Sequence, residues 1–229
     1  METISGIRET IERMRRRAED PEFQARAEAL AAQEHDRLAT QAEAARLRYL
    51  VESGIPRAYW EHLNLPRETE ALGAVRELLA GGPSVVILGG PKGRGKTTAL
   101  AFACHAKRGR FVEAQDLFRL SSFAADDWLD LQETPLLALD EAGTEFLGDV
   151  LAVNLFSVLN ARIQNLRPTA IATNLSVADF RTRFLRGAME RLDDRLRACG
   201  KWVSLPGESM RQHWSESHHE RDPGEDDHE

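Results

Sequence analysis

A glycine-rich segment near the middle of the chain has the residue types and spacing of a phosphate-binding loop. Residues 90–97 read GPKGRGKT, a complete G-x-x-x-x-G-K-T pattern that lies between an apolar run and a predicted helix. Its glycines let backbone N–H groups approach a phosphate closely, and the helix that follows adds its positive N-terminal dipole. We expect Lys96 to reach the β- and γ-phosphates and the Thr97 hydroxyl to bind Mg²⁺. The pattern predicts a nucleoside triphosphate site, and a glycine-rich turn without a ligand is the alternative.

An acidic pair supplies the second half of such a site. Asp140 and Glu141 come directly after another apolar run, about 40 residues beyond the glycine-rich segment. We expect Asp140 to hold the Mg²⁺ shell and Glu141 to act as the general base for the attacking water. A cap of the following helix is the alternative role for Glu141. The adjacent acids argue against small-molecule kinases with the same glycine-rich pattern, because those enzymes need no hydrolytic base at this position.

A third apolar run ends in a polar side chain, Asn174. Ligands of parallel α/β sheets lie outside the carboxyl ends of the strands, so Asn174 is expected near the glycine-rich segment and the acidic pair. Its amide can donate to and accept from a water molecule or the γ-phosphate. We therefore interpret Asn174 as a nucleotide sensor, and a cap of the following turn is the structural alternative.

These residues require a sheet whose strands end at a common edge, and the pattern of the chain predicts one. Short apolar runs alternate with helical stretches, which is typical of a parallel sheet covered on both faces. The expected strands are 84–89, 110–114, 136–140, 169–173 and 201–205. The expected helices lie near 70–80, 96–107, 115–123, 147–165 and 188–198. The predicted fold class is α/β, with a five-stranded parallel sheet between helices.

The first 50 residues differ in composition from the rest and predict helices alone. They contain ten Ala, ten acidic residues and nine Arg, with no Lys. Asp20-Pro21 has the form of an N-cap followed by the first helical residue, so we expect a helix over 21–51 after an earlier amphipathic one. We interpret residues 1–52 as an N-terminal α-helical arm that docks on another protein's helices. A solvated, charged helix is the alternative.

Composition and charge exclude several other classes. The chain has 229 residues, two Cys and a net charge of −7, with no run of 18 consecutive apolar residues. A disulfide scaffold, a zinc cluster, a membrane-spanning helix and a secretory signal are therefore not expected. These features favour a cytoplasmic location with reduced thiols. Residues 214–229 hold seven acids and one Arg, and we expect an acidic disordered tail there.

The ordered motifs resemble those of the AAA+ ATPases, and more narrowly the DnaC/IstB-like branch of bacterial helicase loaders and transposition helpers. The motifs are GGPKGRGKTT, LLALDEAG, IATN and ERLDDRL, with SGIPRAYW at the domain entrance. The resemblance covers about residues 53 to 211 and implies a P-loop AAA+ core over 53–213. Only 24 residues follow the last expected strand, so we expect no C-terminal lid domain. By family analogy, Ile55, Pro56 and Tyr59 would lie near the adenine, and the alternative is that they only pack the entrance segment onto the sheet.

The resemblance implies an ATP hydrolase with ATP and Mg²⁺ as cofactors. Arg195 matches the arginine finger that acts on a neighbouring subunit's ATP, so the chain is expected to self-associate on ATP. The alternative for Arg195 is an ordinary salt bridge with Asp193 or Asp194. Arg211 matches a second sensor, although Met210 stands where the family has an aromatic residue.

The expected site residues form three sets. The catalytic set is Lys96, Glu141, Asn174 and Arg195. The nucleotide-binding set is Gly90, Pro91, Lys92, Gly93, Arg94, Gly95, Lys96, Thr97, Thr98, Asp140 and Arg211. The metal ligands are Thr97 and Asp140.

The function that the resemblance favours is ATP-dependent loading of a replicative DNA helicase onto single-stranded DNA. The arm would grip the hexameric helicase, and the AAA+ core would assemble on ATP and single-stranded DNA. An IstB-like helper of DNA transposition is the second interpretation, and a protein that sequesters the helicase without loading it is the third. The short helical arm favours the loader over the transposition helper. Such helpers need to engage duplex DNA, and no base-reading motif is visible in the sequence. No membrane partner is expected.

Overall fold

The computed structural model describes residues 6, 12, 14, 15, 20–64, 66–119, 125–143, 149–185 and 187–210. The chain forms two compact units, Met1–Tyr49 and Leu50–Glu229. Arg211, the expected acidic tail and most of the first expected helix lie outside the described residues. Within the described residues, no helix combines the length and the apolar character needed to cross a bilayer.

The described part of the N-terminal unit contains one long helix. This helix, α2, spans Pro21–Glu52, and the Asp20 carboxylate accepts a hydrogen bond from the Glu22 N–H at 3.0 Å. The predicted N-cap and first-turn proline are therefore confirmed. The buried residue of α2, Leu50, already belongs to the second unit. Within its own unit the helix buries no side chain, so this unit has no hydrophobic core among its described residues.

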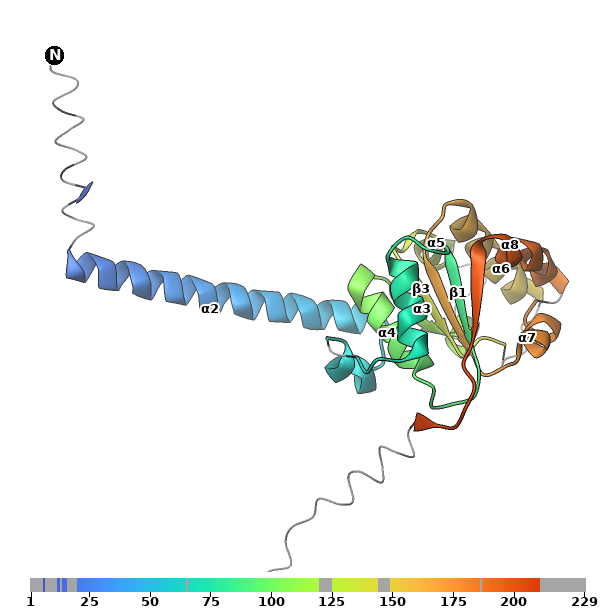
Figure 1. Ribbon diagram of the computed structural model, residues 1–229. Coiled ribbons are helices and arrows are strands. Elements are labelled where there is room, and N and C mark those ends of the chain that lie inside the picture. The colour runs from blue at the N-terminus through green and yellow to red at the C-terminus, as the bar shows by residue number, and fades with distance from the viewer. Residues whose placement is uncertain are drawn as a thin grey trace, which may run out of the picture. The chain divides into compact units, whose positions relative to one another are not determined.

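Five parallel strands form the sheet of the second unit. They are β1 (Val85–Gly89), β2 (Arg110–Glu113), β3 (Leu137–Asp140), β4 (Thr169–Thr173) and β5 (Gly200–Ser204). Their order across the sheet is β2-β3-β4-β1-β5, and every neighbouring pair is parallel (Figure 1). β4 lies between β1 and β3 although it follows both in sequence. The carboxyl ends of these three strands are therefore adjacent.

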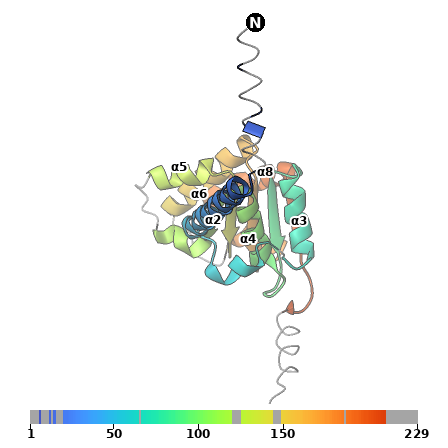
Figure 2. The ribbon, with the colours of Figure 1, turned by 90° about the vertical axis from the view of Figure 1, so that its left-hand side faces the viewer.

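Helices cover both faces of the sheet. The α-helices of this unit are α3 (Glu70–Leu79), α4 (Lys96–Lys107), α5 (Ala125–Glu133), α6 (Asp149–Gln164), α7 (Val177–Arg183) and α8 (Asp193–Cys199). Its 3-10 helices are η1 (Arg57–His62), η2 (Ala114–Arg119) and η3 (Gly187–Leu192). α3 and α4 lie on the face that is turned toward the viewer in Figure 2, and α5, α6 and α8 lie on the opposite one.

Strand side chains alternate between the two faces and determine the packing on each. Toward α6 the strands present large apolar residues such as Leu139 and Ile171, which join a buried cluster with side chains of α5, α6, α7 and α8. The residues between them in sequence, such as Ala138 and Ala170, point to the face of α4 and are fully buried. These small side chains let α4 pack close to the sheet, and the start of α4 is thereby fixed at the carboxyl edge.

The predicted five-stranded parallel sheet is confirmed, and each strand agrees with its expected range within one residue at each end. The expected helix near 115–123 is present in its described part as a 3-10 helix, Ala114–Arg119. The buried residues Ala114 and Leu117 are three apart, which matches the period of that helix type. The expected helix near 188–198 begins as η3 and continues as α8.

Two helices, α5 and α7, do not appear among the sequence predictions. α7 has seven residues, too few for a helical period to show. It begins at Ser176, whose hydroxyl accepts a hydrogen bond from the Asp179 N–H at 3.1 Å. α5 has nine residues and buries Trp128 and Leu131 on one side. Both helices owe their place to a cap or to tertiary packing rather than to a long repeat.

A fully buried arginine ties α6 to α5 and to the start of β4. Arg162 donates from Nε to Thr169 Oγ1 at 3.0 Å and from Nη2 to the Pro168 carbonyl at 2.7 Å. Its Nη1 donates to two carbonyls at the C-terminal end of α5, each at 2.9 Å, where the helix dipole favours a positive charge. Burial, with a smaller contribution from the Arg167 charge, lowers the pKa of Arg162 to about 9. The group therefore remains a cation at neutral pH.

Replacing Arg162 with Met should lower the free energy of unfolding by about 3 kcal/mol, because buried carbonyl groups lose their donor while most of the side-chain volume is kept. Arg197→Met is the matched control, since that side chain is 57% exposed and pairs with Asp193 at 2.7 Å. The control should cost less than about 1 kcal/mol. Urea unfolding of both full-length variants measures the difference. Equal losses would show that the buried network does not stabilise the fold.

Candidate functional site

The glycine-rich segment forms the turn between β1 and α4 at the carboxyl edge of the sheet. β1 ends at Gly89 and α4 begins at Lys96. Gly93 and Gly95 have φ angles of 79° and 76°, a left-handed conformation that glycine adopts without steric cost. Gly95 is also the N-cap residue of α4. The loop therefore places backbone N–H groups and a helix N-terminus at one point, which is an anion-binding arrangement.

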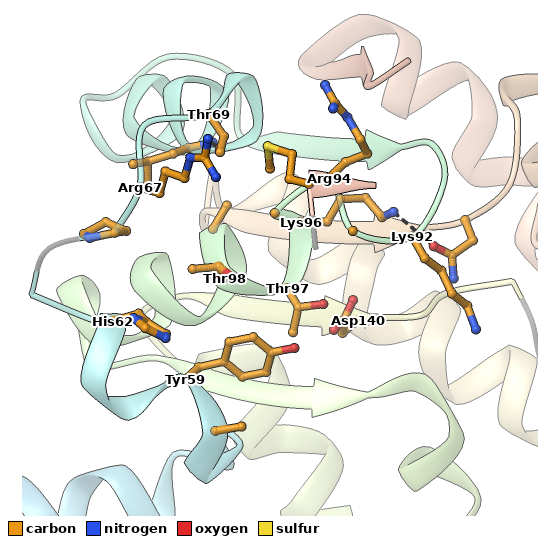
Figure 3. A pocket seen from close by; sticks show the side chains of 18 of the residues that line it. Tyr59, His62, Arg67, Thr69, Lys92, Arg94, Lys96, Thr97, Thr98 and Asp140 are labelled. Atoms are coloured by element: carbon orange, nitrogen blue, oxygen red, sulfur yellow. Dashed lines mark hydrogen bonds between the residues drawn. The ribbon is translucent and has the colours of Figure 1, made fainter. Parts of the chain in front are cut away.

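The Lys96 side chain lies buried at the centre of this loop, and the residue is 6% exposed. Its Nζ donates to the carbonyl oxygens of Gly90 and Pro91 at 2.6 and 2.7 Å. It also donates to Asn174 Oδ1 at 3.0 Å (Figure 3). These bonds join the loop after β1 to the residue after β4. Lys96 and Asn174, which are 78 positions apart in sequence, are thus brought together as expected.

The Thr97 side chain lies beside Asp140 (Figure 3), and its hydrogen bonding to the carboxylate favours the charged form of Asp140. Asp140 is 5% exposed and accepts a second hydrogen bond from the Glu141 N–H at 2.9 Å. Burial raises the pKa of Asp140, and these two hydrogen bonds partly oppose the rise. The neighbouring carboxylates of Glu141 and Glu113 raise it slightly further.

These two side chains fit a magnesium ion. A hydroxyl and a carboxylate are hard oxygen ligands of the kind that Mg²⁺ prefers, and a buried carboxylate is stabilised by a nearby cation. In the described part of the chain, no group of three His, Cys, Asp or Glu side chains could hold a metal ion. Mg²⁺ at Thr97 and Asp140 would therefore draw its other ligands from water and from a bound phosphate, as is usual for this ion.

Glu141 has a backbone conformation that is rare for a residue with a side chain. Its φ is 56°, in the left-handed region that costs an L-residue about 1 kcal/mol or more. Its side chain is exposed and lines the pocket described below. The next N–H, that of Ala142, donates to the Ala172 carbonyl at 2.9 Å and holds this turn beside β4. A strained residue that is held in place by its neighbours is typical of functional sites.

The site opens into a pocket of about 630 Å³, a size that suits a small-molecule ligand. Its lining residues are Ala58, Tyr59, His62, Pro66, Arg67, Thr69, Leu72, residues 92–99, Asp140, Glu141, Thr173, Asn174 and Met210. Figure 3 shows Tyr59, His62 and Arg67 at one end and Lys92 and Asp140 at the other. One end thus carries the glycine-rich loop with the Asp140 carboxylate, and the other is lined by an aromatic ring, an imidazole and a guanidinium.

The entrance segment contributes to the pocket in a different way from the expected one. Tyr59, in η1, lines the pocket and points its ring into it (Figure 3). Ile55 is buried in the core, and Trp60 Nε1 donates to its carbonyl at 2.9 Å. Of the three residues expected near an adenine, only Tyr59 therefore lines the pocket, while Ile55 packs the segment onto the sheet.

Two parts of the pocket were not predicted from the sequence. One lies between η1 and α3, and the other is formed by the chain that follows β5. The missed residues include His62, Arg67, Thr69 and Met210. Thr69 is the N-cap of α3, and its hydroxyl accepts a hydrogen bond from the Leu72 N–H at 3.1 Å. A threonine directly before a helical stretch is a recognisable cap signal. The other residues are brought in by the tertiary fold and carry no sequence signal of their own.

Two expected arginines are placed away from the pocket centre. The Arg94 guanidinium points away from the pocket (Figure 3) and donates to the Glu208 carbonyl at 3.1 Å. Arg195, in α8, does not line the pocket of its own chain. Its Nη1 is buried without a hydrogen-bond partner among the described residues.

The alternative role for Arg195, an ordinary salt bridge, is not observed in the part of the chain that the structure describes. Asp193 pairs instead with Arg181 at 3.0 Å and with Arg197 at 2.7 Å. The Arg197 guanidinium, followed by smaller contributions from Arg181, lowers the pKa of Asp193. The Asp193 carboxylate is thus already paired on both sides.

Comparisons with known proteins agree with this geometry. A family model described as "IstB-like ATP binding protein" matches residues 81–217. No curated protein sequence matches the chain. A solved structure of DnaI is 20% identical and covers 67% of this chain and 95% of its own, with a TM-score of 0.54. A DnaC helicase loader is 22% identical over 66% of this chain and 100% of its own, with a TM-score of 0.51.

A third similar structure is a replication initiator DnaA bound to AMPPCP and single-stranded DNA. It is 19% identical, covers 73% of this chain and 56% of its own, and has a TM-score of 0.56. At these identities the solved structures establish a shared fold. The match of the family model is independent of them and covers the loop, the acidic pair, Asn174 and Arg195.

Asp140→Asn should raise the free energy of unfolding at pH 7 by about 1 kcal/mol, because it removes a buried charge. Burial raises the pKa of Asp140 in the folded chain above its unfolded value. The cost of the carboxylate is therefore absent below the unfolded pKa and grows as pH rises through the interval between the two values. Urea unfolding at pH 7 and at pH 4 should show that the gain shrinks in acid.

The matched control for this change is Glu133→Gln, at an exposed position of α5. It should alter the free energy of unfolding by less than about 0.5 kcal/mol at either pH. A loss of stability in Asp140→Asn at pH 7 would contradict the assignment of Asp140 as a carboxylate held in place at the expense of stability.

Proposed function

Because the chain belongs to the family of IstB-like ATP-binding proteins, we propose that it is an AAA+ ATPase that loads a replicative DNA helicase onto single-stranded DNA. ATP binding and hydrolysis are the activity of the family, and the helicase and the DNA are the proposal. One observation carries it. The chain combines a pocket at the glycine-rich loop of its second unit with a long helix, α2, whose Phe23, Leu30 and Leu38 side chains are exposed.

In this proposal the phosphate end of the pocket binds and activates ATP. The loop N–H groups and Lys96 bind the β- and γ-phosphates. Lys96 would exchange its bonds to the loop carbonyls for bonds to phosphate oxygens, which are stronger because both partners are charged. Thr97 and Asp140 would hold Mg²⁺, whose charge stabilises the phosphates during transfer to water. The Thr97–Asp140 hydrogen bond supports this pairing.

Hydrolysis further requires a base and a group that orients the γ-phosphate. Glu141 is proposed as the base, because it lines the pocket beside Asp140 and is held in a strained turn. Asn174 is proposed to orient the γ-phosphate or the attacking water. Its contact with Lys96 Nζ at 3.0 Å supports this role, since both side chains can reach one phosphate oxygen.

Arg195 is proposed to act on the ATP of a neighbouring subunit. It lies outside the pocket of its own chain and has no ion pair among the described residues. An arginine supplied by another subunit stabilises the charge that develops on the γ-phosphate and makes hydrolysis depend on assembly. Self-association on ATP follows from this role.

Mixed assemblies test the proposed action of Arg195. Arg195→Ala and Lys96→Ala should each lower the ATPase rate by about 10³-fold or more. In a 1:1 mixture about one quarter of the interfaces join an intact Arg195 to an intact Lys96, so about a quarter of the wild-type rate should return. The measurement is steady-state ATPase activity of the mixture against each variant alone. A mixture no more active than its parts would exclude action across a subunit interface.

α2 supports a role as a docking arm. Phe23, Leu30 and Leu38 are 40%, 66% and 52% exposed. At about 100° per residue, these three side chains fall within roughly 80° of the helix circumference. Ala27 lies on the same side, and the charged residue Glu34 interrupts the stripe within this arc. A helix with such a stripe fits a groove between the helices of a partner, which we propose to be the replicative helicase.

The second candidate is an IstB-like helper of DNA transposition, which the family match favours as directly as a loader. The two functions share the ATP site and differ in the protein that the arm binds. Sequestration of a helicase without loading is the third candidate function, and it requires the same contact between the arm and the helicase. These functions are separated by the captured partner and by its activity rather than by the ATPase.

Affinity capture with Glu141→Gln as the bait tests the proposed function, because slow hydrolysis should hold the ATP-bound assembly. We expect it to recover a hexameric replicative helicase from the source cells. Leu30→Glu in the same bait should lower the recovery about tenfold or more by placing a charge in the stripe. Leu47→Glu is the matched control, since Leu47 is 43% exposed but lies outside the stripe.

The captured protein decides between the candidates. Recovery of a transposase instead of a helicase would assign the chain to the transposition helpers. A helicase that is captured but not delivered to single-stranded DNA in a loading assay would assign it to the sequestering proteins. Equal recovery by Leu30→Glu and Leu47→Glu would remove the stripe from the docking role.

A further inference from the structure

The chain that follows β5 runs along the back of the phosphate loop. β5 pairs with β1 in parallel register, with Ser204 opposite Gly89, so the chain leaving β5 emerges beside the start of the loop. The Leu205 N–H donates to the Gly89 carbonyl at 2.8 Å and continues this pairing by one residue. We name the segment Leu205–Met210 the strap.

The strap makes two further hydrogen bonds with the loop, at Gly93 and at Arg94. The Met210 N–H donates to the Gly93 carbonyl at 3.0 Å. Arg94 Nη1 donates to the Glu208 carbonyl at 3.1 Å. The contact is close, because a Cβ atom on Gly93 would lie 2.0 Å from Ser209 Oγ. Glycine is thus needed at position 93 for the strap to fit as well as for the turn.

These hydrogen bonds leave the phosphate-binding groups of the loop available. They use the Gly93 carbonyl and the Arg94 side chain, which points away from the pocket (Figure 3), and they take up no loop N–H group. At the same time Met210 lines the pocket at the end of the strap. The strap therefore supports the loop on the side away from the pocket, and its last residue, Met210, lines one side of the pocket.

We propose that the strap is a positioning element of the nucleotide site. It holds Gly93 and Arg94 in the conformation that binds a nucleoside triphosphate, so that less ordering is needed when the ligand binds. This inference rests on the proposed ATP site and assigns to Arg94 a task different from direct phosphate binding. Arg94 acts through the strap, and the strap sets the affinity for ATP.

The first test compares Arg94→Ala with Glu208→Ala in the full-length chain. Arg94→Ala removes the donor, whereas Glu208→Ala keeps the backbone carbonyl that accepts the bond. In nucleotide-free protein, exchange of the Met210 amide hydrogen should be about tenfold faster or more in Arg94→Ala and unchanged in Glu208→Ala. The dissociation constant for ATP should rise about fivefold to tenfold in Arg94→Ala and stay unchanged in Glu208→Ala.

A second pair of variants tests the strap without touching the loop. Met210→Pro removes the N–H that bonds to Gly93, and Met210→Ala keeps it. The proline variant should bind ATP about fivefold more weakly than the alanine variant at the same unfolding midpoint. Equal affinities in this pair would overturn the proposal, whatever the effect of Arg94→Ala.

The outcomes separate this inference from the proposed function. Weaker ATP binding in Arg94→Ala with unchanged Met210 exchange would assign Arg94 to direct phosphate contact and overturn the proposal. ATP binding by the wild-type chain with no effect in either pair would overturn the strap and keep the ATP site. A wild-type chain that binds no ATP would refute the proposed function and, with it, the positioning role.

Discussion

The buried Lys96 ammonium holds together the parts of the molecule that must meet for phosphate chemistry. It bonds to two carbonyls of the loop after β1 and to the amide oxygen of Asn174 after β4. A phosphate oxygen is a stronger hydrogen-bond partner for the ammonium than these carbonyl and amide oxygens, because both partners are then charged. The geometry of the loop, of Asn174 and of the carboxyl edge is thus arranged around one cation that gains by binding an anion.

A second buried cation, Arg162, differs from Lys96 because its hydrogen-bond partners stabilise the fold and leave no place for a ligand. Its partners are carbonyls at the C-terminal end of α5 and at the start of β4, on the far side of the strands from the loop. They are all supplied by the fold, and its guanidinium, which is fully buried, is not exposed to any ligand. Arg162 therefore stabilises the sheet that fixes the site, whereas Lys96 is held where a ligand can reach it.

Much of this arrangement was predictable because it depends on local pattern. The strands are short apolar runs, and each polar residue that follows one must lie at the carboxyl edge of a parallel sheet, which is why Asp140 and Asn174 could be placed near the loop. The direction of the Arg94 side chain could not be predicted, since it depends on β5 lying beside β1. Met210 and His62 were missed for the same reason. They reach the pocket through tertiary contacts, which the local sequence pattern does not specify.

The segment between the end of α2 and Tyr59 is short and is packed against β2. Tyr59 follows the end of α2 by only seven residues. Between them, Ser53 is buried and its carbonyl accepts a hydrogen bond from the Phe111 N–H at 2.7 Å. A Cβ atom on Gly54 would lie 2.3 Å from the Phe111 carbonyl oxygen, so the chain passes here against β2 with no room to shift. Tyr59 at the pocket therefore lies only five residues beyond a point where the chain is packed against β2, and the fold of the second unit itself fixes the entrance segment beside the site.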